Sequence, residues 1–282
     1  MLIAPFQRDP TQTLTLRQNF RREFNKRWNH IRRIVKESFQ RDALAIKRGV
    51  SPFQEATPLS PDPRVTITDQ QRLDRFTAWF EQAMRQDILG QTNITGANGR
   101  VQNDGWMDRF ITSAYLAGLR RANAQMRAAG MDVPEITERT LQQPQHQQQI
   151  AQMKTRYYSD LAGIISVVVA QSQRELSNAL SEGKSNAEIT ALINDRVDSI
   201  GKVRSNVLVM DSVVRTFNLA LLARYAQENI ERVTATVEFT TAGDSRVCPI
   251  CRDLSGRIYT IQEAVGVIPV HGGCRCSWSP VL

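Results

Sequence analysis

The cysteines of this chain are concentrated in one short segment of the sequence. All four, Cys248, Cys251, Cys274 and Cys276, lie within the last 35 of 282 residues, and His271, one of three histidines, lies among them. Cys248 and Cys251 are separated by two residues, and so are His271 and Cys274. Across a tight turn this spacing points two side chains at one ion, and two such pairs provide the four N/S ligands of a closed structural Zn²⁺ site. The sequence therefore predicts a zinc-binding C-terminus.

The fifth donor leaves the ligand set open. We expect Cys248, Cys251, His271 and Cys274 to bind the ion, with Cys276 as the alternative to Cys274 or His271, because residues two apart on a strand face the same way. Two disulfides or unbound reduced thiols are the competing interpretation. No secretory leader is evident at the N-terminus, so we expect a reducing compartment, where clustered cysteines favour metal over disulfides.

A structural role fits this cluster better than a catalytic one. A catalytic zinc keeps an open position for water and needs a nearby general base, whereas four or five ligands crowd this short segment. The segment from Cys248 to Leu254 looks like the start of a RING finger, but a RING needs eight ligands. Zinc-bearing HNH nucleases need further His or Asn groups, and the other two histidines, His30 and His146, are expected at the surface or an interface. We expect no enzymatic activity.

The net charge of +8 is concentrated at the other end of the chain. Residues 1–50 hold 12 of the 36 Lys and Arg but only 4 of the 28 Asp and Glu, so the remaining 232 residues carry no net charge. From Leu16 to Phe39 apolar residues recur every three or four positions, which predicts one buried face of a helix. The basic residues on its other faces are Arg17, Arg21, Arg22, Lys26, Arg27, Arg32, Arg33 and Lys36.

This basic helix has three interpretations. It can be a solvated face over a core-packed stripe, a contact with polyanionic surface such as DNA phosphates or an acidic protein, or a membrane-surface helix. The longest apolar run, Leu161 to Ala170, is too short for the roughly 20 residues that span a bilayer, so no membrane is required.

The middle of the chain predicts a helical body. Apolar periodicity and turn residues indicate helices over about 68–89, 106–129, 150–181, 185 onward and 202–229, with a loop or small hairpin over 90–105. The Gln-rich stretch over 142–149 is either a linker or the frayed approach to the next helix. Ser185 and Glu188 match a capping box. From Arg232 the pattern changes to alternation typical of a half-buried strand, with Val237 and Phe239 on one face.

The predicted fold class is mainly α, a multi-helix body with a small C-terminal β-rich zinc-binding subdomain. Its divisions are a basic amphipathic arm over 1–50, a Pro-rich connector over 51–67, the helical body over 68–231 and the Cys/His subdomain over 232–282.

The C-terminal motif resembles a known family. Thr241-x-x-Asp244-x-Arg246-Val-Cys248-x-x-Cys251-x-x-Leu254-x-Gly256, followed by Pro269-x-His271-x-x-Cys274-Arg-Cys276, is similar to the ending of the phage head morphogenesis family, minor head proteins like the F protein of phage Mu. The family commonly has proline where Gly272 stands here. Its helix before the β end often carries Ala-Arg-Thr-Glu, where this chain has Val209-Met210-Asp211-Ser212.

The resemblance implies a low-copy structural or assembly protein of a tailed-phage capsid. Its expected partners are the portal protein, other capsid or scaffold proteins and packaged double-stranded DNA, and its expected location is the virion interior near the portal, or the host cytoplasm during assembly. The zinc site would stabilise the folded C-terminal segment. The rival hypotheses are a zinc-dependent nuclease or toxin-like effector delivered with phage DNA, and a zinc-bearing nucleic-acid-binding protein.

Overall fold

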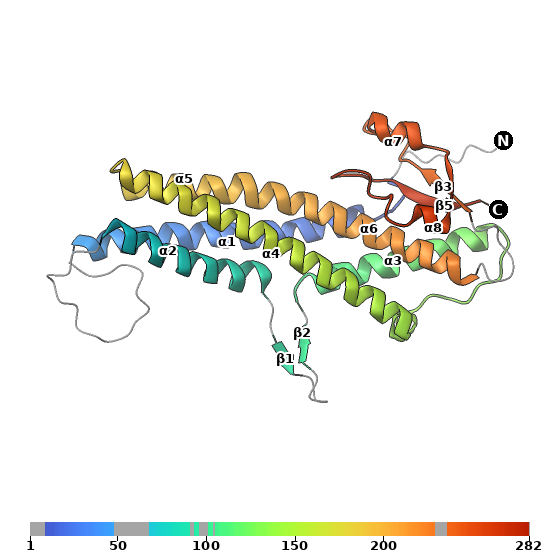
Figure 1. Cartoon of the computed structure of the whole chain (residues 1–282). Helices are drawn as coiled ribbons and strands as arrows, with labels where there is room; N and C mark the ends of the chain where they lie inside the picture. Colours follow the sequence, from blue (N-terminus) through green and yellow to red (C-terminus); the bar gives the residue numbers. More distant parts are fainter. Residues whose placement is uncertain are drawn as a thin grey trace. The chain divides into compact units, whose positions relative to one another are not determined.

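The chain folds into two compact units, each assembled from separate stretches of sequence. The computed structural model describes residues 9–47, 68–90, 93–95, 101–103, 105–228 and 236–281. Unit 1 comprises residues 1–21, 107–157 and 207–282, and unit 2 comprises 22–106 and 158–206 (Figure 1). The predicted connector over 51–67 lies outside the described residues. The predicted division of the chain into four consecutive segments stays a prediction.

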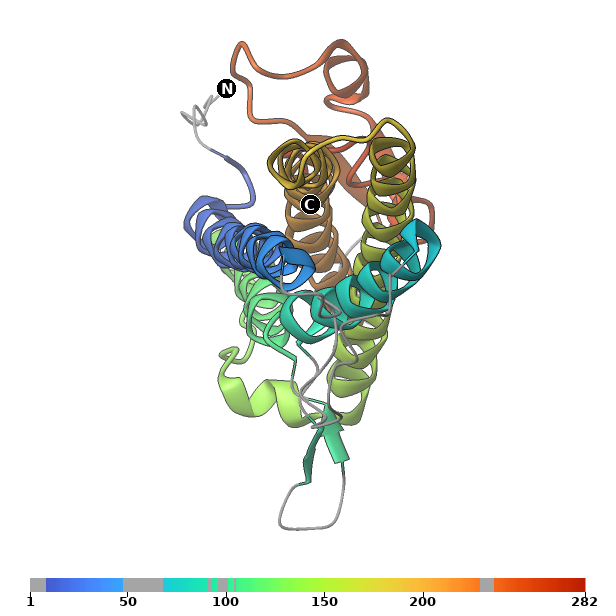
Figure 2. The same ribbon diagram turned by 90° about the vertical axis from the view of Figure 1, so that its left-hand side faces the viewer.

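Unit 2 is built from helices, seen nearly end-on in Figure 2. They are most of α1 (Leu14–Lys47), α2 (Asp69–Met84) with its π-helical continuation η1 (Arg85–Leu89), the second half of α4 (Pro144–Ser181), α5 (Asn186–Arg196) and η3 (Val197–Lys202). The predicted capping box is confirmed, since the Ser185 hydroxyl accepts from the Glu188 amide and the Glu188 carboxylate accepts from the Ser185 amide.

The apolar stripe of α1 is part of the protein core. Phe24, Trp28, Ile31, Val35 and Phe39 are each at most 1% exposed. Phe24 meets Trp106 edge-on, and the Trp28 indole N–H donates to Ser205 Oγ at 2.8 Å. Because these side chains are already buried in protein, the stripe is not available to a membrane surface, and the membrane-helix interpretation is wrong for this structure.

Unit 1 combines helices with a small sheet. Its helical elements are the start of α1, α3 (Asp108–Ala128), η2 (Glu138–Gln142), the first half of α4, most of α6 (Val203–Glu228), α7 (Pro249–Leu254) and α8 (Ile261–Ala264). Three antiparallel strands, β3 (Thr236–Thr240), β4 (Ile258–Thr260) and β5 (Ser277–Pro280), form a sheet in the order β4-β3-β5. The predicted fold class is thus confirmed.

The β-rich end shares its hydrophobic core with the helices of unit 1. Phe239 and Trp278, paired across β3 and β5, are buried in one cluster with Phe217 and Leu221 of α6 and Met126 of α3. Side chains on β3 alternate as predicted, with Val237 and Phe239 buried. A segment of about 50 residues buries little surface by itself, and here the helices supply the missing side of the core.

One glycine permits a close approach of α3 and α6 in this core. A Cβ atom at Gly118 of α3 would collide with the Phe217 carbonyl oxygen and would lie 2.9 Å from the Ala220 Cβ of α6. Only a residue without a side chain fits between these two backbones.

Two sequence predictions are corrected. Of the two interpretations of the Gln-rich stretch, the linker is wrong from position 144 onward, because α4 begins at Pro144 and the stretch is the start of that helix. Proline suits the first helical position, where its missing N–H needs no partner. His146, predicted at the surface, is 1% exposed, and its Nδ1 lies 2.9 Å from the Tyr115 hydroxyl. The region of 90–105 forms the small hairpin that was one of its two predictions, with β1 (Asn93–Thr95) paired to β2 (Val101–Asn103).

One helical stretch passes a length-and-composition test for a membrane span. It covers Asn186–Gln227 with a mean hydropathy of 1.3 over its most apolar window, and 61% of that window is buried inside the protein. Core helices of globular proteins pass the same test.

Candidate metal centre

The first ligand pair is positioned by the start of α7. Cys248 caps this short helix, with Pro249 at its first position, and the Cys251 amide donates to the Cys248 Sγ at 3.3 Å. This hydrogen bond is the main cause that lowers the pKa of Cys248. The turn thus favours a thiolate, which is the form of cysteine that binds metal.

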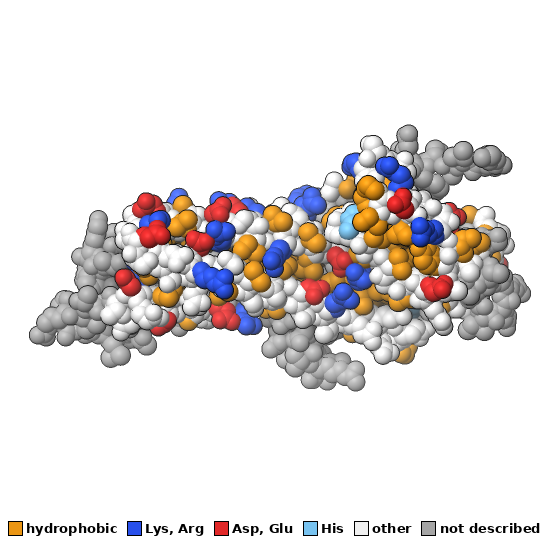
Figure 3. Space-filling view, turned by 45° about the horizontal axis from the view of Figure 1, so that its top comes forward, with side chains coloured by type: hydrophobic (Ala, Val, Ile, Leu, Met, Phe, Trp, Pro, Cys, Tyr) orange, Lys and Arg blue, Asp and Glu red, His pale blue; other side chains and the backbone are white. Residues whose placement is uncertain are grey.

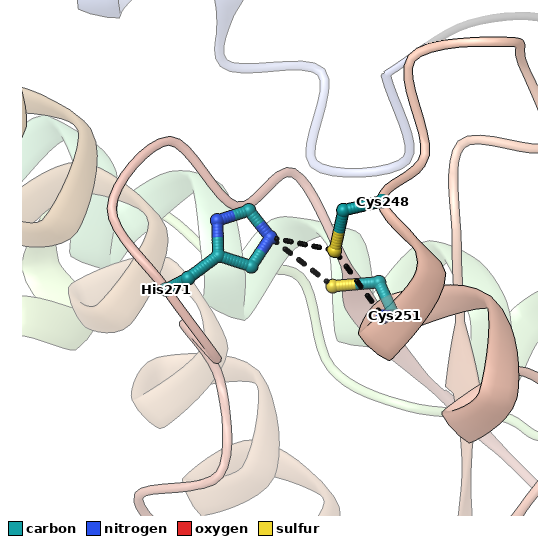
Figure 4. A group of neighbouring side chains, drawn as sticks. All are labelled: Cys248, Cys251 and His271. Carbon is teal, nitrogen blue, oxygen red and sulfur yellow. Dashed lines mark hydrogen bonds between the residues drawn. The ribbon is translucent and has the colours of Figure 1, made fainter.

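His271 faces this pair from the loop before β5. Its Nε2 lies 3.1 Å from Cys248 Sγ and 3.4 Å from Cys251 Sγ (Figure 4). The other ring nitrogen, Nδ1, lies 2.9 Å from the Gly272 carbonyl oxygen. As the donor of this hydrogen bond, Nδ1 keeps the proton and leaves the lone pair of Nε2 directed at the two sulfurs, the usual way a ligating histidine is oriented.

The remaining cysteines form a second group that shares Cys251. Donor atoms of Cys251, Cys274 and Cys276 lie within 4.8 Å of one another, as do those of Cys248, Cys251 and His271. Hydrogen bonding from Cys276 is the main cause that lowers the pKa of Cys274 to about 5, whereas burial raises the pKa of Cys251 to about 12. All five predicted ligand residues line one hollow.

The donor set fits a tetrahedral zinc ion. Zinc bonds of about 2.3 Å to sulfur and about 2.0–2.1 Å to nitrogen place S and N about 3.6 Å apart in a tetrahedron. The two measured S–N distances, 3.1 and 3.4 Å, are close to that value. All four thiols are free, so the paired-disulfide interpretation finds no support here. Thiolate and imidazole donors in this number favour a soft or borderline cation such as zinc.

An ion pair outside the ligand set joins the two halves of the site. Both guanidinium nitrogens of Arg275, between Cys274 and Cys276, donate to the two Asp244 carboxylate oxygens at 2.8 and 2.6 Å. Asp244 lies just before Cys248 and also accepts from Arg246. The Arg275 hydrogen bonds hold the pKa of Asp244 well below its usual range. Sequence reasoning recorded both residues within a motif but assigned them no role.

The predicted basic contact residues fall into different environments. Arg17 is 4% exposed, ion-pairs with Asp9 and donates to Met210 Sδ, so its guanidinium is buried within unit 1. Burial is the main cause that lowers its pKa to about 10. Arg27 is half-buried, stacked over the Trp106 ring at 4.3 Å. Arg32 is partly exposed and pairs with Asp198 at 3.2 Å. The exposed members are Arg21, Arg22, Lys26, Arg33 and Lys36.

Comparison with known proteins gives one match. A family model described as Phage Mu protein F like protein matches residues 170–279. The chain carries a Phage Mu F-like region. No curated protein and no solved structure matches the chain. This match covers 110 of the 282 residues and agrees with the resemblance of the C-terminal motif to the phage head morphogenesis family.

The Phage Mu F-like region extends well beyond the Cys/His cluster. It includes the end of α4, α5, η3, α6 and the sheet, so α6, one of the two helices that supply this core, belongs to it, whereas α3 lies outside the match. The stretch 209–212, where the family often has Ala-Arg-Thr-Glu, lies on α6, and its Asp211 ion-pairs with Arg215 at 3.1 Å. Helix α1 lies outside the matched residues.

Proposed function

We propose that this protein is a minor head protein of a tailed phage, bound at the portal vertex inside the capsid, where it serves assembly and not catalysis. The observation that carries the proposal is the Phage Mu F-like match, which covers both the Cys/His cluster and helix α6, which packs against it. A family of head morphogenesis proteins acts in the virion or during its assembly, and its members contact other phage structural proteins.

The proposed cofactor is one zinc ion held by four of the five donors in the cluster. Cys248, Cys251 and His271 converge on one point, and Cys274 or Cys276 supplies the fourth ligand. Zinc in such a site is closed and structural, and its binding energy adds directly to the folding energy of the segment that holds it.

The arrangement of the cluster supports the non-enzymatic part of the proposal. A hydrolytic zinc needs a free coordination position and a general base. Here the donors near the site outnumber the four positions of a tetrahedral ion, and the carboxylate of Asp244 is already held by Arg275 and Arg246.

The assembly role is tested by sedimentation of the purified chain with assembled portal from the same phage. We expect the chain to co-sediment with portal and with portal-containing capsids, and to stay in the supernatant with capsid shells that lack portal. Equal binding to both kinds of shell would contradict the portal assignment.

The zinc assignment and the nuclease rival are tested on the purified protein alone. Metal analysis should find about one zinc per chain, as one tetrahedral site requires. His271→Ala should reduce the bound metal without removing any activity on nucleic acid, since none is expected. A nuclease activity that disappears in a folded His271→Ala protein would establish the rival function.

A further inference from the structure

We infer that Asn218 of α6 is a positioning residue for the proposed zinc site, because it holds the turn from Cys274 to Cys276 against that helix. Its side-chain nitrogen Nδ2 donates two hydrogen bonds, one to the Val214 carbonyl oxygen at 2.8 Å and one to the Cys276 carbonyl oxygen at 3.2 Å. The inference rests on the zinc site of the proposed function, and it names a residue outside the Cys/His cluster on which that site depends.

The burial of Asn218 is unusual for a polar side chain. Charged side chains of both signs are intermingled on the molecular face in Figure 3, where water solvates them. Asn218, by contrast, is 2% exposed and lies on the helix that contributes Phe217 and Leu221 to the C-terminal core. A polar side chain at such a position costs free energy unless it is hydrogen-bonded. A leucine of similar size would avoid that cost, so packing alone does not account for an asparagine here.

The surroundings of Asn218 fix the direction of its amide group. Both hydrogen-bond partners are carbonyl oxygens, which only accept, so the NH₂ group faces them and the side-chain oxygen does not. The Val214 carbonyl belongs to the preceding turn of α6, so the helix itself holds the amide in the orientation that reaches Cys276. Oδ1 is buried and has no hydrogen-bond partner among the residues that the structure describes. The amide is therefore oriented as a donor to the ligand turn, at the cost of one unmade hydrogen bond.

The hydrogen bond to Cys276 restrains a turn that carries two of the five donors. The Cys276 carbonyl directly precedes Ser277, the first residue of β5, and Cys274 lies two residues before Cys276. Donor atoms of Cys251, Cys274 and Cys276 lie within 4.8 Å of one another. A shift of this turn would therefore move both candidates for the fourth ligand relative to Cys251. Asn218 acts on the ligand geometry through the backbone of the turn, as groups behind metal ligands commonly do.

Helix α6 approaches the same ligand segment at a second point. A Cβ atom at Gly272, next to His271, would lie 3.1 Å from Val207 Cγ1. Val207 and Asn218 are 11 positions apart, close to three full turns, so both project from the same face of α6. The segment from Gly272 to Cys276 therefore lies along that face. The ion would join the first ligand pair, on α7, to a segment that α6 holds.

The test compares two variants of the full chain. Asn218→Leu removes the donor at similar size, whereas Asn218→Ser keeps a hydroxyl that reaches the carbonyl four residues back in its own helix but is too short to reach Cys276. Against a coloured zinc chelator, we expect both variants to retain zinc about tenfold less well than wild type, the lower end of the usual effect of such groups. With Co²⁺ in place of zinc, visible absorption reports the ligand geometry, and both variants should change the shape of the bands.

Two controls separate positioning from general stability. Ser212→Ala removes a hydrogen bond from another buried side chain of α6, which donates to the Val209 carbonyl of the same helix. Leu141→Ala destabilises unit 1 from a separate hydrophobic cluster. Leu141→Ala should lower the urea midpoint of unfolding, and both controls should retain zinc and the Co²⁺ band shape of wild type.

Wild-type zinc retention by Asn218→Ser would overturn the inference, because the hydrogen bond to Cys276 would then be dispensable. Equal losses of zinc in Asn218→Leu and Leu141→Ala would also overturn it, since retention would follow stability alone. A wild-type protein that binds neither zinc nor Co²⁺ would instead refute the proposed cofactor itself, and with it any role of Asn218 toward a metal. The portal assignment is measured by co-sedimentation and does not depend on these results.

Discussion

At the residue scale, the Asp244–Arg275 pair links the two sequence segments that supply the metal ligands. The two hydrogen bonds run between the loop before Cys248 and the Cys274–Cys276 turn. A bidentate arginine–carboxylate pair fixes both distance and orientation. The pair therefore orients ligands that it does not itself include, as hydrogen-bonding groups behind metal ligands commonly do.

Asp244→Asn should weaken metal retention by about 10- to 100-fold, the usual effect of losing a group that orients the ligands. Arg275→Gln should have an effect of the same size, because either change breaks the same pair. Competition with a coloured zinc chelator measures the retention. The control is Arg246→Gln, since Arg246 is 77% exposed and binds Asp244 only from the neighbouring turn. If that control lost as much zinc as Asp244→Asn, the Arg275 link would not be the cause.

His146 makes unit 1 sensitive to acid. Its pKa is lowered by burial and by the nearby positive charge of Arg224. The unfolded chain therefore takes up the proton first as pH falls below about 6.5, so the stability contributed by neutral His146 is present above that pH and lost below it. We expect the free energy of unfolding of wild type to fall more between pH 7.5 and 5.5 than that of His146→Gln. The candidate metal centre is present in both proteins, so its own pH dependence cancels in the comparison. If the free energy of unfolding fell equally in both proteins, His146 would not be the source of the acid sensitivity.

At the element scale, α3 and α6 pack closely enough that Gly118 leaves no room for a side chain. Gly118→Ala should destabilise the protein by about 1–3 kcal/mol, the usual cost of overpacking. The matched control is Gly163→Ala on α4, where a Cβ atom would meet nothing within 4 Å. That change should be neutral or stabilise by up to about 1 kcal/mol, because alanine is the better helix former. Urea unfolding of both variants provides the comparison.

The sequence predicts most of these elements because their signals are local. The capping box at Ser185, the spacing from Phe20 to Phe39 and the alternation around Phe239 each depend on a few neighbouring residues. Helix α4 begins at Pro144, before the position of about 150 that apolar periodicity predicts, because a Gln-rich stretch has no such periodicity. The burial of His146 against Tyr115 shows that this first turn packs into the protein. Nothing in the sequence indicated that Asp244 meets Arg275, because that contact joins positions 31 apart.

At the scale of the whole molecule, the metal centre belongs to unit 1 alone. All five donors lie within residues 207–282, and unit 2 contains none of them. The sheet next to the centre has further support, since Phe239 and Trp278 pack against Phe217 and Leu221. The same buried cluster contains Cys251, Cys274 and Cys276, so the candidate ligands and the sheet share one hydrophobic core.

Removal of the metal should loosen this end in part. With a strong chelator, amide hydrogen exchange should rise most in 244–254 and 269–276, while β3 and β5 stay better protected because of their shared core. Amides of α2 and α5 in unit 2 should change little. Substitution of Cys248 by Ser should reproduce the pattern without chelator. An unchanged exchange profile in 244–254 after the metal has been removed would refute a structural role for the ion.

The composition of unit 1 also bears on how the protein is made. Its segments are far apart in the sequence, since residues up to 21 join 107–157 and 207–282. During synthesis the first segment leaves the ribosome long before Cys274 and Cys276 are made. Phe20 and Arg17 therefore lack their packing partners in unit 1 until late in translation. Long-range closure of this kind is slow and leaves apolar surface exposed in the meantime. A chain that stops before Cys274 and Cys276 can therefore form helices but lacks two of the five candidate ligands, so zinc retention, if the site binds zinc as proposed, would report that synthesis has passed these residues.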